Sequence, residues 1–227
     1  MKLPNKSLER KLFKSGYRLI YAVDEVGMGC LAGPVVVCAV AMTNTFYNKH
    51  HKKLRWVRDS KLIQARQREI LSAELVKEKD LVYAVSLCSP KVIDKLNIYN
   101  AARLAMKKSV NKMNNELRIK NNESDNHNSK FAIQNSKVIV LVDGPYKISK
   151  LDMEQIPIIK GDRKVFAIAC ASIIAKVYRD KMMARYSKKY PGYGFEKHKG
   201  YGTKYHQAQL IALGPSPIHR LSFRLEY

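Results

Sequence analysis

The chain has 227 residues and carries 42 Lys and Arg against 19 Asp and Glu, which gives a formal charge of +23 at pH 7. So few acidic residues cannot neutralise this surplus, and we therefore expect a polyanionic partner, with nucleic acid as the first candidate. A lysine-rich surface that is merely solvated is the alternative. No apolar run is long enough to cross a membrane, so we expect no membrane association.

Cysteine usage and the N-terminus bear on the cellular compartment. The four cysteines, Cys30, Cys38, Cys88 and Cys170, lie far apart and lack the spacing of a zinc site, so we expect free thiols in a reducing compartment. Because the first six residues contain no apolar signal region, the expected location is the cytoplasm. The length suits a single domain over 1–227, which we expect to act as a monomer.

Apolar runs and turn signals divide the first half of the chain into short elements. In chain order they predict a helix at 8–14, strands at 17–23 and 34–42, a solvated connection at 43–53, a helix at 60–75, a strand at 81–88, a short helix at 89–96 and a longer helix at 97–113. Ser60 is expected to be the N-cap of its helix, because the apolar positions that follow it recur at helical spacing.

The second half of the chain begins with a polar segment. Residues 114–136 are rich in Asn, Lys and Ser, which predicts a flexible low-complexity insertion within the domain. Beyond it the sequence predicts strands at 138–142 and 156–160, a long helix at 165–189 and a C-terminal helical and loop region at 190–227. This order of elements indicates an α/β fold, with a mixed β-sheet flanked by helices.

Four carboxylates fall at the ends of three predicted strands. Asp24 and Glu25 follow the first strand, Asp143 follows the fourth and Asp162 follows the fifth. In α/β sheets, ligands collect at the carboxyl ends of the strands. Clustered carboxylates suit two divalent cations roughly 3.5–4 Å apart, as in metal-dependent phosphodiester hydrolysis, with Mg²⁺ the best match and Mn²⁺ a substitute.

Asp180 competes with Asp162 for the fourth position. It lies inside the predicted helix at 165–189, one turn from Lys176, where an i,i+4 ion pair accounts for it. Asp162 is therefore the preferred ligand, because it stands at the end of a strand.

The stretch after the first strand carries a family signature. Residues 24–35 read DEVGMGCLAGPV. This string resembles the first motif of the ribonuclease HII family, the type 2 ribonucleases H, whose pattern is DEVGRGPLAGPV. Met28 stands where the family has arginine, and Cys30 where it has proline. Further blocks resemble the family in its order: DSKL at 59–62, VDG at 142–144, KGD at 160–162, ASIIAKV at 171–177, YPGYGF at 190–195, HKGYGT at 198–203 and GPSPIHR at 214–220.

The resemblance implies a ribonuclease H-like fold and a specific reaction. The expected enzyme is an endonuclease that hydrolyses the phosphodiester 5′ of a ribonucleotide, in an RNA–DNA hybrid or at a single ribonucleotide in duplex DNA, to give 3′-hydroxyl and 5′-phosphate. The family's catalytic and metal-binding carboxylates fall on Asp24, Glu25, Asp143 and Asp162, and its sugar-packing tyrosine falls on Tyr201.

Other residues are candidates for substrate binding. The glycines of Gly27-Met28-Gly29 let the main chain approach a ribose, whose 2′-hydroxyl donates and accepts hydrogen bonds. Ser60 and Lys61, at a predicted helix start, are expected to hold a phosphate with the help of the helix dipole. Two alternatives remain open: another nuclease of the same fold group, such as a junction resolvase, and a non-enzymatic basic RNA-binding protein.

Overall fold

The computed structural model describes residues 7–51, 54, 57, 60, 63–123 and 136–223. Its strands are β1 (Leu19–Val26), β2 (Val35–Thr43), β3 (Leu81–Cys88), β4 (Val138–Asp143) and β5 (Glu154–Ile158). They form one five-stranded sheet with the order β3-β2-β1-β4-β5. The β1–β2 and β2–β3 pairs are antiparallel, whereas the β1–β4 and β4–β5 pairs are parallel. The mixed sheet predicted from the sequence is confirmed.

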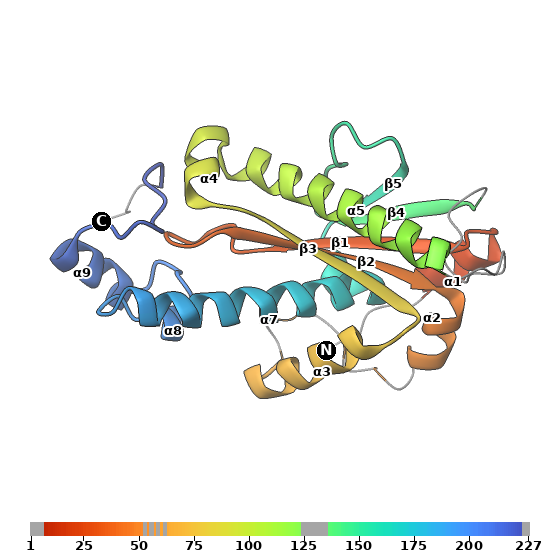
Figure 1. Cartoon of the computed structure of the whole chain (residues 1–227), viewed down its shortest axis with the longest axis horizontal. Coiled ribbons are helices and arrows are strands. Elements are labelled where there is room, and N and C mark those ends of the chain that lie inside the picture. The colour runs from red at the N-terminus through yellow and green to blue at the C-terminus, as the bar shows by residue number, and fades with distance from the viewer. Residues whose placement is uncertain are drawn as a thin grey trace.

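Helices cover both faces of the sheet (Figure 1). They are α1 (Ser7–Lys14), α2 (Asn44–His50), α3 (Ala65–Lys77), α4 (Pro90–Leu96), α5 (Ile98–Glu123), α6 (Gly161–Lys164), α7 (Phe166–Lys189), α8 (Phe195–His198) and α9 (Lys204–Leu213). α5 packs on one face of the sheet, and α7 packs on the other together with α3. Among the described helices, none is both long and apolar enough to cross a membrane.

Each face of β1 contributes to its own hydrophobic core, because successive side chains of a strand point in opposite directions. Ile20 and Ala22 belong to the core beneath α7, whereas Leu19, Tyr21 and Val23 belong to the core beneath α5. All five side chains are fully buried. A central strand of this kind admits polar side chains only where it leaves the two cores, and that is where its acidic residues stand.

The prediction of a solvated connection at 43–53 is wrong. α2 occupies most of this segment, and the hydroxyl of Thr43 caps it by accepting a hydrogen bond of 3.1 Å from the N–H of Phe46. The side chains of Phe46 and Tyr47 are buried in the core beneath α7. Burial of these two aromatic rings outweighs the polar character of the residues around them.

α5 is longer than predicted, and residues 114–123 of the predicted insertion are helical. The side chain of Leu117 is fully buried, which anchors this part of the helix in the core beneath α5. The hydroxyl of Tyr21 donates a hydrogen bond of 2.8 Å to Oδ1 of Asn114, so the same part is also tied to β1. Residues 124–135 of the predicted insertion lie outside the described residues.

Candidate active site

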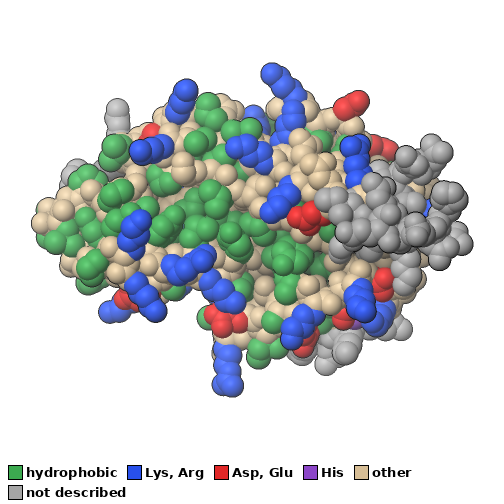
Figure 2. Space-filling view, in the orientation of Figure 1, with side chains coloured by type: hydrophobic (Ala, Val, Ile, Leu, Met, Phe, Trp, Pro, Cys, Tyr) green, Lys and Arg blue, Asp and Glu red, His purple; other side chains and the backbone are tan. Residues whose placement is uncertain are grey.

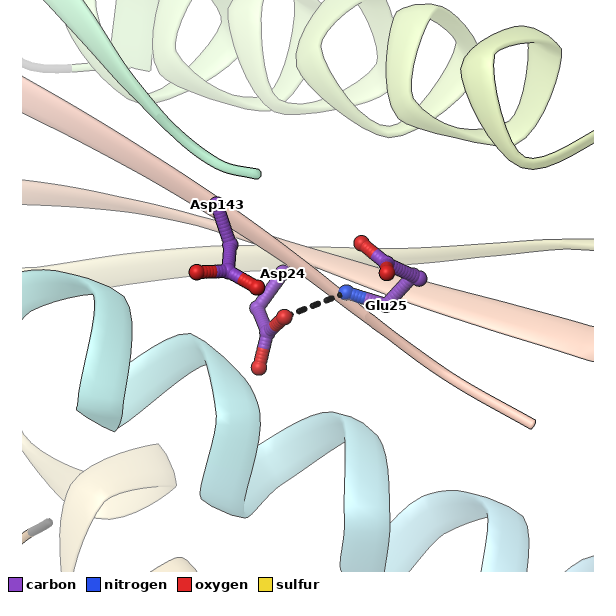
Figure 3. Close-up of side chains that lie close together, drawn as sticks. All are labelled: Asp24, Glu25 and Asp143. Atoms are coloured by element: carbon purple, nitrogen blue, oxygen red, sulfur yellow. Dashed lines mark hydrogen bonds between the residues drawn. The ribbon is translucent and has the colours of Figure 1, made fainter. Parts of the chain in front are cut away.

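Three carboxylates meet where two parallel neighbouring strands end. β1 and β4 pair in register up to Val23 and Val142, so Asp24 and Asp143 are the next residues on adjacent strands. Carboxylate oxygens of Asp24, Glu25 and Asp143 all lie within 4.8 Å of one another. The N–H of Glu25 donates a hydrogen bond of 2.8 Å to Oδ1 of Asp24 (Figure 3). The register of the β1–β4 pair therefore assembles this acidic group.

Asp24 is the most buried member of the acidic group, with 5% of its surface exposed. Burial raises the pKa of Asp24 well above its ordinary value, and the charges of Glu25 and Asp143 raise it further, whereas a hydrogen bond with Ser172 lowers it. Carboxylates this close repel one another, and a divalent cation relieves the repulsion because it is a hard ion that takes oxygen ligands. The donor set therefore fits a divalent metal.

Asp162 lies beside the acidic group on a different element. It occupies the first turn of α6, because β5 ends at Ile158 rather than at residue 160 as predicted. The N–H of Gly161 donates a hydrogen bond of 2.6 Å to Oδ1 of Asp143, which ties the start of α6 to the end of β4. The charge of Asp162 also contributes to the raised pKa of Asp24, although less than the other two carboxylates do.

Asp180 belongs to a separate ion-pair network. Its Oδ1 lies 2.7 Å from Nζ of Lys176, and its Oδ2 lies 3.7 Å from Nη2 of Arg68. The i,i+4 pair predicted from the sequence is therefore confirmed. Among the described residues, Asp180 is not one of those that line the cavity over the acidic group.

That cavity has a volume of about 200 Å³ and gathers segments that are far apart in the sequence. Nine of the ten residues selected from the sequence line it: Asp24, Glu25, Gly27, Met28, Gly29, Ser60, Asp143, Asp162 and Tyr201. The tenth, Lys61, lies outside the described residues. The early glycine loop, the strand ends and the late loop thus meet at one place.

Sequence reasoning missed two cavity residues on α7, Ser172 and Lys176. Burial lowers the pKa of the Lys176 ammonium. Both residues, with Asp180, follow an i,i+4 spacing, and residues with this spacing share one helix face. This polar stripe was the signal that could have identified them.

Ser60 lies in the cavity for a different reason from the one predicted. α3 begins at Ala65, so the prediction of Ser60 as a helix N-cap is wrong. Instead, Oγ of Ser60 lies 3.0 Å from Oγ of Ser172, and the side chain of Arg68 donates a hydrogen bond to the backbone carbonyl of Ser60. These contacts with α3 and α7 hold Ser60 in the cavity over the carboxylates.

Arg220 holds the Gly27-Met28-Gly29 loop by its carbonyl groups. The guanidinium donates hydrogen bonds to the carbonyl oxygens of Gly27 (2.6 Å), Met28 (2.8 Å) and Gly33 (3.0 Å). Because the C=O and N–H of a trans peptide point in opposite directions, the N–H groups of Met28 and Gly29 point away from Arg220. In the described part of the chain, neither N–H donates a hydrogen bond, and both residues line the cavity.

A second buried arginine, Arg179 of α7, holds later residues of the same β1–β2 connection. It donates hydrogen bonds to the carbonyl oxygens of Ala32 (3.0 Å), Pro34 (3.0 Å) and Lys199 (2.8 Å). Gly27 has a φ of +94°, and a Cβ at this position would overlap the Arg179 guanidinium. Glycine is therefore required where the loop passes over α7.

Tyr201 reaches the cavity from the loop between α8 and α9. A backbone bridge between Tyr201 and Cys30 joins this loop to the β1–β2 turn, and the N–H of Leu31 donates a hydrogen bond of 2.8 Å to the carbonyl of Gly200. Burial raises the pKa of the Tyr201 phenol. Nζ of Lys176 lies 5.9 Å from the centroid of the Tyr201 ring. The Gly27-Met28-Gly29 loop (the glycine loop) and the loop that carries Tyr201 thus form adjoining walls of one cavity.

Similarity to known proteins agrees with this geometry. A family model described as ribonuclease HII matches residues 22–226. Ribonuclease HII of Caldicellulosiruptor bescii is 47% identical over 219 residues, which cover 95% of this chain and 91% of that protein. The structure of a PCNA:RNase HII complex from Archaeoglobus fulgidus matches with a TM-score of 0.66 and 26% identity, over 92% of this chain and 96% of that one. Ribonuclease H2 from Pyrococcus horikoshii matches with a TM-score of 0.61 and 25% identity, over 90% and 93%.

The mixed sheet, together with the similarity to solved ribonucleases HII and H2, defines a nuclease of the ribonuclease H fold, with an acidic group at neighbouring strand ends that suits a divalent ion. The chain belongs to the ribonuclease HII family. It is accordingly a ribonuclease H endonuclease that acts on nucleic acid, and the resemblance in its sequence motifs is confirmed. Neither a junction resolvase nor a non-enzymatic RNA-binding protein is favoured.

Proposed function

We propose that the enzyme hydrolyses the phosphodiester bond on the 5′ side of a ribonucleotide and leaves a 3′-hydroxyl and a 5′-phosphate. Its substrate is an RNA–DNA hybrid or a DNA duplex with a single embedded ribonucleotide. The observation that carries this proposal is the cavity of about 200 Å³, where carboxylates, backbone N–H groups and an aromatic residue meet. The carboxylates, the backbone N–H groups and the aromatic residue have separate tasks in the reaction.

The carboxylates would hold two divalent ions, Mg²⁺ or Mn²⁺. The proposed ligands are Asp24, Glu25, Asp143 and Asp162. An oxygen-only donor set supports this assignment, and so does the raised pKa of Asp24, which burial and then the charges of Glu25 and Asp143 cause. When bound, such ions activate a water for attack on phosphorus and stabilise the leaving oxygen. Ser172, braced by Ser60, orients the Asp24 carboxylate for this task.

The backbone of the glycine loop would distinguish ribose from deoxyribose. The N–H groups of Met28 and Gly29 are donors for the oxygen of a 2′-hydroxyl, and deoxyribose has no such oxygen. Because the backbone supplies the donors, the selectivity does not require the side chain of Met28. The ring of Tyr201 packs on the sugar and positions the scissile phosphate for in-line attack.

Cationic residues would bind the phosphates. Lys176 supplies an ammonium in the cavity itself, and Ser60 and Lys61 remain our candidates for a neighbouring phosphate. Figure 2 shows Lys and Arg side chains spread over the visible face rather than gathered in one patch. A net charge of +23 in this distribution supports duplex binding through many weak backbone contacts.

The same proposal includes a monomer that works in the cytoplasm. All four cysteines are free and buried, which suits a reducing compartment. One cavity within a single chain contains all the proposed groups that the structure describes, which supports activity without a second subunit.

One cleavage assay on matched duplexes tests the proposal. The three substrates share a sequence and contain all DNA, one ribonucleotide, or a full RNA strand. With Mg²⁺ or Mn²⁺ we expect cleavage of the second and third but not of the first, with the cut 5′ of the ribonucleotide. The 3′ end should be extended by a polymerase without further treatment. Comparable cleavage of the all-DNA duplex would contradict the proposal.

A further inference from the structure

Three buried histidines lie behind the Tyr201 loop, and the proposed function uses none of them. His198, His206 and His219 are exposed by 9% or less. Nε2 of His206 lies 3.0 Å from Nε2 of His219, and the rings of His198 and His206 stack with their centroids 4.2 Å apart. Two imidazoles that face each other through the same nitrogen need one donor and one acceptor, so their tautomers are linked.

The contacts at both ends of the pair determine which nitrogen is protonated. The N–H of Ser216 donates a hydrogen bond of 2.8 Å to Nδ1 of His219, so this nitrogen has no proton and Nε2 of His219 carries it. Oγ of Ser216 lies 2.8 Å from the same Nδ1. At the other end, Nδ1 of His206 lies 2.9 Å from the carbonyl oxygen of Tyr201, which can only accept, so Nδ1 of His206 is protonated.

A directional chain of donors follows from these two ends. The N–H of Ser216 donates to His219, Nε2–H of His219 donates to Nε2 of His206, and Nδ1–H of His206 donates to the carbonyl of Tyr201. The N–H of Thr203 also donates to this carbonyl, at 2.8 Å, and a carbonyl oxygen has lone pairs for both donors. Each bond is satisfied only if both imidazoles are neutral.

The environment of the histidines favours the neutral form. The pKa of His206 is lowered to about 4, mainly by burial and to a smaller extent by the neighbouring His198 and His219. Burial also lowers the pKa of His219. His198 is fixed in a complementary way, because the N–H of Gly200 donates to its Nδ1 at 3.1 Å and its Nε2 therefore donates to the carbonyl of Tyr193 at 2.8 Å.

We propose that His206, held in one tautomer by His219, is a positioning residue that sets the place of Tyr201 in the cavity. This inference rests on the role of Tyr201 under the proposed function. The phenol and the carbonyl of Tyr201 belong to one residue, so a carbonyl fixed from behind by His206 fixes the direction in which the ring leaves the backbone. This chain of hydrogen bonds through His219 and His206, which we call the relay, thus connects the Ser216 turn to the cavity wall.

Two isosteric substitutions separate the two bonds of His206. An Asn side chain places its amide N–H near the position of Nδ1 and keeps the bond to Tyr201, whereas a Gln side chain reaches the position of Nε2 and keeps only the bond to His219. Each variant loses one of two buried bonds, so a merely structural role predicts equal single-turnover rates. We expect His206→Asn to be about tenfold faster than His206→Gln, the value of one net hydrogen bond. Duplex affinity in Ca²⁺ should be equal.

A double-mutant cycle with Tyr201→Ala decides whether His206 acts through Tyr201. We expect the difference between the Asn and Gln variants to disappear in the Tyr201→Ala background. A difference that persists there, or equal rates for the two variants in the parent background, would overturn the positioning role. If Tyr201→Ala alone leaves turnover unchanged, the proposed role of Tyr201 itself fails, and the positioning proposal fails with it.

A measurement on the unaltered protein is independent of whether the variants fold. Nitrogen-15 chemical shifts of the imidazoles at pH 7 distinguish the two neutral tautomers and the cation. We expect His206 to be protonated at Nδ1 and His219 at Nε2. The opposite tautomer of either ring, or an imidazolium at this pH, would overturn the relay.

Discussion

Nη2 of Arg220 donates a hydrogen bond of 2.6 Å to the carbonyl oxygen of Gly27, 193 positions earlier in the chain. The same guanidinium donates a hydrogen bond to the carbonyl of Met28. Arg220, in the motif at 214–220, therefore fixes the orientation of the peptide groups in the motif at 24–35. The orientation of the loop N–H groups is therefore a property of residue 220 as much as of the glycines.

Arg220→Lys should impair discrimination between ribose and deoxyribose. A lysine ammonium cannot reproduce the planar fork that binds three carbonyls, so the loop peptides lose their fixed orientation. We expect cleavage of the single-ribonucleotide duplex to fall by roughly tenfold or more, through the loss of at least one charged hydrogen bond. Arg185→Lys, an exposed position on α7, is the matched control and should cleave normally. Unaltered cleavage by Arg220→Lys would show that the fork does not orient the loop.

Asp24→Asn should abolish cleavage while duplex binding survives, because the amide keeps the shape but loses the charge that holds the metal. Turnover above about a hundredth of the parent rate would contradict the assignment. The substitution also replaces a carboxyl whose ionisation is opposed by burial and by its acidic neighbours, so the metal-free variant should melt about 2–4 °C higher than the metal-free parent, the shift that about 1 kcal/mol produces in a chain of this size. Thermal unfolding in EDTA measures this shift, and a lower melting temperature would contradict it.

Asp162→Asn should lose more activity than Asp180→Asn. The carboxylate of Asp162 lines the cavity, whereas the carboxylate of Asp180 is paired with Lys176 and Arg68. Steady-state cleavage at saturating Mg²⁺, together with the Mg²⁺ concentration for half-maximal rate, compares them directly. The reverse order would move the fourth ligand onto α7.

Met28→Arg should tighten duplex binding without creating new selectivity. The arginine adds one charge-assisted phosphate contact, on the order of 1.5–3 kcal/mol before desolvation. The slope of log affinity against log salt should steepen by about 0.9. Ile211→Arg adds the same charge on an exposed site of α9 and serves as the control. Cleavage of all-DNA duplex by Met28→Arg would show that the side chain, not the backbone, limits substrate choice.

Stability should fall on mild acidification. His206 has a pKa of about 4 in the folded protein against an ordinary value of 6.5, so the unfolded state binds more protons between these values. The contribution of His206 to the free energy of unfolding therefore decreases as the pH falls from about 6.5 towards 4. Urea unfolding of the parent and of His206→Asn across this window isolates the contribution, since the variant lacks this ionisable group. Parallel curves for the two proteins would contradict the buried neutral ring.

Local patterns predicted those parts of the fold that depend on a few neighbouring residues. The apolar alternation at 81–88 and the strand that runs into Asp24 follow directly from side-chain periodicity. α2 was missed because the burial of Phe46 and Tyr47 depends on what packs over them. Leu117 was missed for the same reason, as a single apolar residue in a polar-looking helix.

The residues of the cavity that belong to recognisable sequence motifs were predicted. Strand ends indicated the carboxylates, because the geometry of a parallel pair brings such ends together. The partners of those residues were not predictable in this way. Ser172, Arg179 and Arg220 act through contacts with residues more than a hundred positions away, and nothing in their immediate sequence specifies those contacts.

The central place of β1 has a consequence for biosynthesis. β2 and β3 pair on one side of it through antiparallel connections, whereas β4 must come from beyond the long α5 to pair on the other side. A ribosome therefore releases the meander of β1, β2 and β3 well before the strand that carries Asp143, and such non-local pairing is slow. Nascent chains pass through a stage in which Asp24 and Glu25 lack their third carboxylate. If Asp143 is the metal ligand we propose, translation products that stop before Val138 should have no hydrolytic activity.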